Sequence, residues 1–405
     1  MNFKEELSIM GKFYLMSMLA PFTNLTYAVF VVYLLAINFS ATLMGSIFAL
    51  SALTVILLEI PTGVVADVYG RKVSTVIGLF LTGISMIIMF LTTNVTWILL
   101  SFIINAIAIT FRSGASEAWL VDYLNHYGKK SYLNKVMSRD RSLFSIMSFF
   151  VAVLSSIILF LFKDTYGLIT VVRVMFLVEA LLIFISGFVG LTTKEPYFKK
   201  KKVKSYFKSE LGNIKATLKK SLKIIKDSKR LPYFFIGASV FFFGIAPMSS
   251  GWQIQLTNNN IDIVLFGVIS GLTYLINFFF LSLNEKIGKK VGVKRLIIIS
   301  LITISFTGIL FGFNFGFWLI PIYLLFYGIW DLLFVNLSVK MNEIIPSKQR
   351  ATILSLKNVT DAIPMMLSSI LLFGLVTDYF SINISLIIGA VFFLISTFFF
   401  TKTLN

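Results

Sequence analysis

The chain of 405 residues is 57% hydrophobic and only 13% charged, with a mean hydropathy of +0.89 and a formal net charge of +18. A soluble domain carries about a quarter charged residues, so these values exclude a soluble globular protein and predict a chain that lies largely in lipid. The absence of cysteine excludes disulfides and thiolate metal sites, and the single histidine, His126, falls in a loop-like stretch and receives no role.

The first long apolar run, residues 13–37, is long enough to cross a bilayer. No small-residue cleavage site follows a short apolar core, so we expect a membrane span rather than a cleaved signal peptide. Similar runs follow it, and because they do not alternate with period two, they favour helices over barrel strands. The twelve predicted spans are residues 13–37, 42–65, 73–92, 96–123, 141–162, 167–191, 231–256, 262–284, 294–313, 317–342, 351–376 and 381–401. We therefore expect an all-α polytopic membrane protein.

Lysine and arginine lie on one side of the predicted membrane. The predicted outer links contain only Lys163, the span interiors contain Arg112, Arg173, Lys340 and Lys357, and all other basic residues lie in the termini or in the even-numbered links. Because basic loops stay in the cytoplasm, this distribution predicts that both termini are cytoplasmic, and it supports the even number of spans.

A long basic link divides the spans into six and six. Residues 192–230 contain 14 Lys or Arg and three acidic residues. Apolar residues within this link recur every three or four positions, which predicts an amphipathic helix on an anionic inner leaflet rather than a nucleic-acid site; they are Phe207, Leu211, Ile214, Leu218, Leu222 and Ile225. We expect an N-terminal six-helix bundle (1–191), a basic cytoplasmic linker (192–230) and a C-terminal six-helix bundle (231–405).

A charged motif joins spans 2 and 3. Its residues are Glu59, Gly63, Asp67, Gly70, Arg71 and Lys72. The motif resembles the loop signature of the major facilitator superfamily, Gly-x-x-x-Asp-x-x-Gly-Arg-Lys. A second copy of the acid-x-x-Gly-basic-basic pattern falls in the corresponding predicted loop of the second half, at Glu285, Gly288, Lys289 and Lys290.

The resemblance implies a two-bundle transporter that alternates access to a central site. In that family the loop acid lies at the positive end of helix 11 and holds the inward side closed, which would place Asp67 near residues 347–350. It also implies a charge cluster that joins Arg71 to an acid of the same half, such as Asp122. Glu59, Gly63 and Asp67 are spaced four apart along one stripe of span 2, so we interpret the motif as a conformational latch.

Ionisable residues inside spans are costly and are therefore functional candidates. The candidates for proton coupling are Arg112, Glu117, Glu179, Asp331 and Asp361. At about 100° per residue, Arg112 and Glu117 point about 140° apart and do not pair with each other, and an Arg–Glu pair between spans 4 and 6 stays open. Thr110, Ser113 and Glu117 would share one face of span 4.

In the second half, Lys357 and Asp361 are four apart and can form an ion pair, which either neutralises itself inside the bundle or belongs to a transport pathway. Asp331 has no basic residue within one turn and suits a proton carrier; the alternative is a structural acid bonded to hydroxyls or to a lysine of another helix. Pro364 predicts a kink in span 11.

Other features bear on the cargo and its direction. Arg112-Ser113-Gly114 resembles the span-4 arginine motif of proton-coupled drug exporters, but span 5 has neither the glycines nor the proline of antiporters, so both directions stay open. The substrate-cavity candidates are Asn24, Tyr27, Ser113, Tyr327, Asn358 and Met365. Trp97, Trp252 and Trp318 lie near predicted outer ends, as residues of an aromatic belt do.

We therefore predict a secondary transporter that exports small amphipathic or hydrophobic molecules, drugs included, in exchange for protons. The alternatives are a proton-linked importer of a polar nutrient and, with less support, a polytopic membrane enzyme or scaffold. The sequence contains no catalytic constellation and no Walker loop. We expect no cofactor or metal, no nucleic-acid partner, and a monomer in a bacterial plasma membrane.

Overall fold

A computed structural model describes residues 3–195, 223–345 and 350–404. Within these ranges the chain is helical and contains no strand. Twelve helical segments are long and apolar enough to span a membrane, which confirms the predicted fold class. They cover Lys4–Ala36, Ala41–Tyr69, Arg71–Leu91, Val95–His126, Lys130–Tyr166, Leu168–Thr192, Leu231–Asn258, Leu265–Val291, Val293–Phe311, Gly316–Ile344, Leu356–Tyr379 and Ile382–Leu404. The amphipathic helix predicted in the linker falls mostly outside the described residues.

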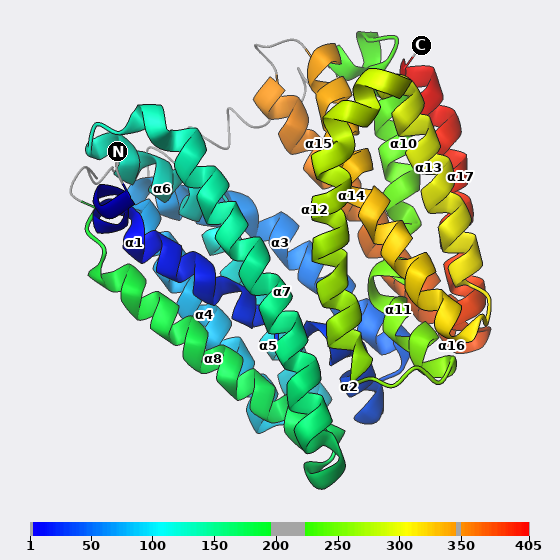
Figure 1. Cartoon of the computed structure of the whole chain (residues 1–405), viewed down its shortest axis with the longest axis horizontal. Helices are drawn as coiled ribbons and strands as arrows, with labels where there is room; N and C mark the ends of the chain where they lie inside the picture. Colours follow the sequence, from blue (N-terminus) through cyan, green and yellow to red (C-terminus); the bar gives the residue numbers. More distant parts are fainter. Residues whose placement is uncertain (1–2, 196–222, 346–349, 405) are drawn as a thin grey trace. The chain divides into compact units, whose positions relative to one another are not determined.

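The chain forms two compact units, Met1–Tyr33 with Leu50–Ser209 and Leu34–Ala49 with Glu210–Asn405. The first unit contains α1 (Phe3–Leu19), η1 (Ala20–Asn24), η2 (Tyr27–Val29), α4 (Arg71–Leu91), α5 (Val95–Arg112), α6 (Ala115–His126), η3 (Lys130–Tyr132), α7 (Leu133–Tyr166) and α8 (Leu168–Thr192). The second contains α10 (Leu231–Phe243), α11 (Ile245–Asn258), α12 (Leu265–Val291), α13 (Val293–Phe311), η4 (Gly316–Trp318), α14 (Leu319–Ile344), α15 (Arg350–Ser368), the π-helix η6 (Ser369–Val376), α16 (Thr377–Tyr379) and α17 (Ile382–Leu404) (Figure 1). Two helices, α2 (Phe30–Ala36) and α3 (Ala41–Tyr69), contribute residues to both units.

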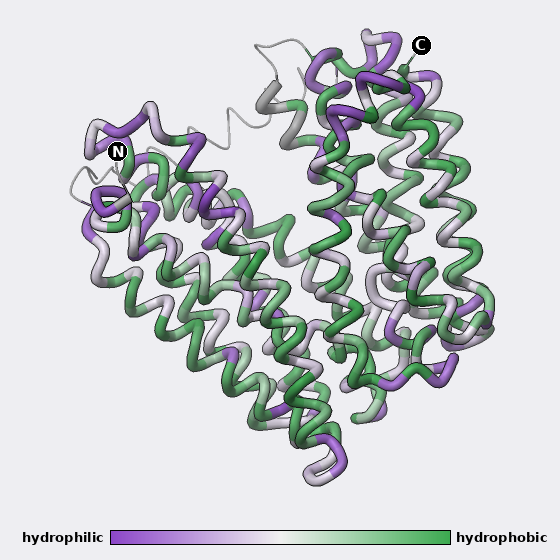
Figure 2. Tube along the Cα trace, viewed as in Figure 1, coloured by the Kyte–Doolittle hydropathy of each residue, from purple (hydrophilic) through white to green (hydrophobic). Residues whose placement is uncertain are grey.

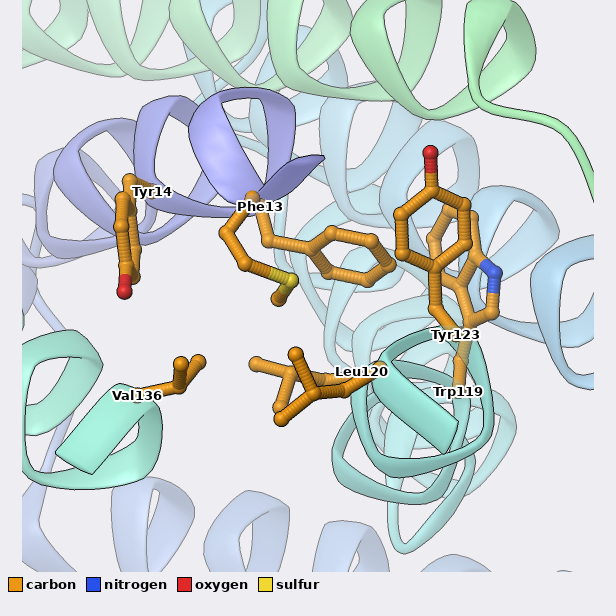
Figure 3. Packing of buried hydrophobic residues seen from close by; sticks show 8 residues of the cluster. Phe13, Tyr14, Trp119, Leu120, Tyr123 and Val136 are labelled. Carbon is orange, nitrogen blue, oxygen red and sulfur yellow. The ribbon is translucent and has the colours of Figure 1, made fainter. Parts of the chain in front are cut away.

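Hydrophilic residues gather at the helix ends of each unit, while the lengths between them are hydrophobic (Figure 2). Helix α1 begins about ten residues before the predicted span because its first turns are packed within the unit. Glu6 is fully buried there and accepts hydrogen bonds from the Tyr14 hydroxyl, at 2.6 Å, and from Arg139. Apolar side chains of α1, α6 and α7 form a core beside it, in which the Phe13 ring lies against Trp119 (Figure 3).

Span 4 is not one continuous helix. Helix α5 ends at Arg112, and α6 starts at Ala115 after Gly114, whose φ of +66° favours glycine. The predicted angle between Arg112 and Glu117, and the shared face of Thr110, Ser113 and Glu117, are therefore wrong. Thr110 is buried, whereas Ser113 and Glu117 are exposed.

The turn after span 8 lies four residues later than the motif predicts. Gly70, with a φ of 112°, makes the turn between α3 and α4. In the second half Glu285, Gly288, Lys289 and Lys290 lie within α12, and the positive φ of 87° belongs to Gly292. The prediction that this second motif lies in a loop is wrong, because α12 continues through it.

One of the three predicted belt tryptophans is a core residue. Trp252 is fully buried and packs against Phe266 and Tyr323, with ring centroids 5.5 and 4.9 Å away. Trp97 and Trp318 are exposed, as predicted. Proximity to the end of an apolar run therefore did not distinguish a lipid-facing ring from one inside the unit.

The first turns of α3 are held within the second unit. The Asp378 carboxylate accepts hydrogen bonds from the backbone N–H groups of Ala41 and Thr42, at 2.9 and 2.7 Å. It thereby satisfies two N–H groups that have no partner within the helix. Gly45 permits close packing beside this cap, since a Cβ there would lie 1.9 Å from the carbonyl oxygen of Ser369.

We expect Asp378→Ala to lower the melting temperature of the purified protein, because loss of a helix cap costs about 1 kcal/mol. Asp164→Ala is the matched control: its carboxylate is 89% exposed and lies 3.8 Å from Lys163. Equal melting temperatures for the two variants would contradict the proposed capping role.

Candidate functional site

The motif between α3 and α4 forms an ion pair within the first unit. The Arg71 guanidinium lies 2.5 Å from a carboxylate oxygen of Asp122 and donates to the carbonyl oxygen of Ala118 at 3.1 Å. The predicted pairing of Arg71 with Asp122 is confirmed. Because both partners are about one-third exposed, this pair contributes little stability by itself and acts mainly by fixing the turn against α6.

Glu195 completes this network, and the sequence analysis did not predict its role. Its carboxylate accepts from the backbone N–H groups of Arg71 at 3.2 Å and Lys72 at 3.5 Å, at the positive end of α4. The Lys72 ammonium donates in return to the carbonyl oxygen of Leu191, at the end of α8, at 2.7 Å. Burial raises the pKa of Glu195 above its usual range, although these N–H groups oppose the shift. Neighbouring ends of α4 and α8 thus cap each other.

The remaining motif residues lie along α3. Glu59 is exposed and accepts a long hydrogen bond of 3.4 Å from the Ser113 hydroxyl, while Asp67 is partly buried. A Cβ at Gly63 would meet no atom within 4 Å, so no close contact requires glycine there. Residues 346–349, which include most of the expected partners of Asp67, lie outside the described part of the chain.

Glu179 on α8 is the most deeply buried candidate in the first unit. It is 0% exposed, and its Oε1 accepts from the backbone N–H of Thr26 at 2.7 Å and from the Thr26 hydroxyl at 2.9 Å. Its Oε2 is buried with no hydrogen-bond partner among the described residues. The possible Arg–Glu pair between spans 4 and 6 does not form, and Arg173 donates instead to the carbonyl oxygen of Phe90 at 2.7 Å.

A cavity of about 200 Å³ lies beside Thr26. Two predicted cavity residues, Asn24 and Tyr27, line it. The rest of the lining is mainly aromatic or methionine, with a second amide and small hydroxyls: Thr23, Phe30, Ser85, Met86, Met89, Ser101, Phe102, Asn105 and Phe176. Such a lining suits a molecule with a large apolar part and few polar groups.

Arg112 lies at a second cavity, of about 240 Å³, in the same unit. Its side chain passes over Gly78, and its guanidinium donates to the Thr82 hydroxyl at 3.3 Å. Glu117 also lines this cavity but is 58% exposed and pairs with Arg141 at 3.6 Å. These two span-4 candidates therefore share a cavity, although they do not pair with each other.

Of the two acids predicted to couple protons in the second unit, Asp361 forms an ion pair and Asp331 forms none with a described residue. Lys357 donates to one oxygen of Asp361, as predicted, and its ammonium lies 5.7 Å from the centre of the Phe242 ring. The other oxygen of Asp361 is buried without a hydrogen-bond partner in the described ranges. Asp331 is partly buried and forms no ion pair with any described residue.

The predicted cavity residues of this unit occupy two helices. Tyr327 on α14 packs against the ring of Tyr323, with centroids 4.7 Å apart, whereas Asn358 and Met365 on α15 are exposed. Pro364 lies inside α15, and the backbone changes to a π-helix five residues later, at Ser369. The two cavities described above are lined by first-unit residues, so the roles of Tyr327, Asn358 and Met365 stay predictions.

We expect Gly78→Ala to destabilise the protein by about 1–3 kcal/mol, the usual cost of overpacking. The new Cβ would lie 2.6 Å from Cγ of Arg112 and 2.7 Å from the carbonyl oxygen of Ala108. Thermal melting measures the loss, and Gly11→Ala, where a Cβ would meet no atom within 4 Å, is the control. A Gly78 variant that melts no lower than the Gly11 variant would refute the packing described for Arg112.

Comparisons with known proteins agree with this architecture. The family model of the Major Facilitator Superfamily matches residues 13–283. Among solved structures, a mutant of the nucleoside transporter NupG is 15% identical, with a TM-score of 0.81 over 97% of this chain and 99% of that chain. A bacterial homologue of the iron transporter ferroportin, in an inward-facing state, is 12% identical, with a TM-score of 0.76 over 98% of each chain.

A D-xylose-proton symporter is 15% identical, with a TM-score of 0.65 over 96% of this chain and 95% of that chain. At these identities the likeness to solved structures concerns the fold alone. No curated protein matches the sequence. The family match covers well over half of the chain, which therefore belongs to the Major Facilitator Superfamily and is a multi-pass membrane transporter of small molecules rather than an enzyme.

Proposed function

We propose that this secondary transporter exports amphipathic molecules in exchange for protons, with Glu179 as the proton carrier. The buried carboxyl group of Glu179 carries the proposal. No cation of the described chain pairs with it, and one of its oxygens has no hydrogen-bond partner there. A carboxyl group without a cation beside it can gain and lose a proton without breaking an ion pair, which favours proton coupling over a structural role.

Thr26 connects this carboxyl group to the cavity beside it. Its backbone N–H and hydroxyl both donate to Glu179, and the same residue lines the cavity of Asn24 and Tyr27. It belongs to the short segment between the 3-10 helices η1 and η2, where span 1 is not α-helical. A molecule in this cavity would therefore act on the hydrogen bonds of Glu179 through one residue, which gives a direct route for coupling.

The cavity lining supports an amphipathic cargo. Aromatic and methionine side chains supply most of the surface, and Asn24 and Asn105 supply amide groups for a few polar contacts. Import of a polar nutrient remains the alternative function, and the direction of the proton gradient that drives uptake into vesicles distinguishes the two.

We further propose that the motif of Glu59 to Lys72 is a latch at the cytoplasmic face, with both termini on that side. The Arg71–Asp122 pair and the Glu195 cap support this role because they fix the motif turn within the first unit. Asp331 and Asp361 are secondary candidates for proton coupling in the second unit. The proposed setting is a bacterial plasma membrane, in which the protein acts as a monomer.

Glu179→Gln should reduce proton-driven uptake into inside-out vesicles to the level of vesicles that lack the protein. The amide can still accept from Thr26 through its oxygen but cannot carry a proton between the two sides. The measurement is uptake of a panel of fluorescent amphipathic compounds under an imposed pH gradient. Exchange of labelled for unlabelled cargo without a gradient should persist.

Asp164→Asn is the control for this experiment, because its exposed side chain lies at the end of α7, away from Glu179. Gradient-driven uptake at the wild-type rate in the Glu179 variant would show that another group carries the proton. Uptake only into right-side-out vesicles under an inward proton gradient would instead favour the importer.

A further inference from the structure

The cavity at Arg112 contains a cation that no acid of the described chain neutralises. Arg112 ends α5 and lines the cavity, and the one described hydrogen bond of its guanidinium goes to the neutral hydroxyl of Thr82. A charge in a membrane-spanning unit is costly unless it is paired or faces water. Arg173 also has a neutral partner, the carbonyl oxygen of Phe90 at 2.7 Å, but it does not line this cavity.

Two buried hydroxyl groups line the same cavity without partners. Thr75 on α4 is 5% exposed and Ser186 on α8 is 1% exposed, and neither hydroxyl oxygen has a hydrogen-bond partner among the described residues. Buried polar groups are normally satisfied, so each exception needs an explanation. Two hydroxyls and a guanidinium on one cavity form a set of donors suited to an anionic group.

Neither acidic group at this cavity pairs with Arg112. Glu117 pairs with Arg141 at 3.6 Å, and Asp140 accepts a hydrogen bond from the Ser17 hydroxyl. The charged side chains of the lining balance in sum, since Arg112 and Arg141 face Glu117 and Asp140 on the same cavity. The guanidinium of Arg112 nevertheless has no acidic partner among the described residues, and the hydroxyls without partners on this cavity belong to Thr75 and Ser186.

Apart from Ser17 and Ser116, the rest of the lining is apolar. Phe13, Trp119 and Leu120 come from the core between α1 and α6 (Figure 3), and Leu79 and Phe144 add further apolar surface. A ligand that matches both parts carries an acidic group at one end and an apolar body at the other. The volume of about 240 Å³ suits a small molecule.

We propose that this cavity binds an amphipathic carboxylate, whose acidic group is held by Arg112 together with the hydroxyls of Thr75 and Ser186. A carboxylate presents two oxygens to a guanidinium and can also accept from both hydroxyls. The further statement that amphipathic carboxylic acids are a class of cargo rests on the proposed function of the protein as an exporter. Binding itself requires neither a proton gradient nor Glu179.

The test compares three probes with the same phenyl end: 3-phenylpropanoate, the isosteric 3-phenylpropanamide, and the cation 3-phenylpropylamine. Binding to the purified full-length protein is measured by calorimetry at one pH, without a gradient. The carboxylate should bind most tightly, and Arg112→Gln should weaken it by roughly ten- to a hundredfold, the usual effect of losing a hydrogen bond to a charged partner. Arg112→Lys should retain part of the affinity.

Two further variants test the same site if Arg112→Gln fails to fold: one removes the two hydroxyls, and the other is a control outside the cavity. Thr75→Val with Ser186→Ala keeps the charge and should weaken carboxylate binding by at least about tenfold, because two hydrogen bonds to a charged group are lost. Arg173→Gln removes a span arginine that does not line the cavity and should bind the carboxylate as the wild type does. Melting temperatures confirm that the compared variants are folded.

Three results would overturn the proposal. The acid and the amide could bind equally tightly, or the amine could bind most tightly. The third is an unchanged affinity for the carboxylate in both the Arg112 variant and the double hydroxyl variant. An Arg112→Gln protein that binds the acid normally and loses only proton-driven transport would also overturn it, because the arginine would then serve coupling. Carboxylate binding without uptake by vesicles would overturn the cargo assignment. If the Glu179 variant transports normally while carboxylate binding still depends on Arg112, the proton-carrier proposal fails and this one stands.

Discussion

The structure depends on how each charge within the membrane-spanning helices is satisfied. A charge placed in hydrocarbon costs several kcal/mol unless a partner or water compensates it. Lys357 compensates Asp361, and a backbone carbonyl accepts from Arg173. In the first unit, Glu179 and Arg112, like Arg173, have only neutral hydrogen-bond partners among the described residues, but the first two lie beside cavities. These two side chains, each beside a cavity, are where a proton and an anionic group can supply the missing compensation.

The helix ends show how the same chain uses charges for order. Glu195 lies at the positive end of α4, and the ammonium groups of Lys72 and Lys12 donate to carbonyl oxygens at the end of α8. Asp378 caps α3 in the same way within the second unit. Carboxylates at helix starts accept from N–H groups that have no partner within the helix, and amines at helix ends donate to the free C=O groups. Both charges also interact favourably with the helix dipole. Charges at the ends therefore position helices, as the buried Glu6 also does through Tyr14 and Arg139.

Local spacing predicted much of the fold but few of the contacts that define the candidate sites. The twelve spans follow from apolar length, the Lys357–Asp361 pair from a spacing of four residues, and the Arg71–Asp122 pair from a motif. The contact of Thr26 with Glu179 joins residues 153 positions apart, and no periodicity within one helix encodes it. The break at Gly114 was missed because the apolar residues on both sides of it were joined into one span, and hydropathy does not detect a single positive φ.

Proton release on cargo binding shows whether cargo and a proton exchange through Glu179. The purified protein in weakly buffered solution, without a membrane gradient, is titrated with a transported compound while the pH is recorded. We expect release of about one proton per bound molecule from the wild type and none from Glu179→Gln, although both bind the compound. Equal proton release from the two proteins, or binding by the wild type with no release at any pH, would contradict this exchange.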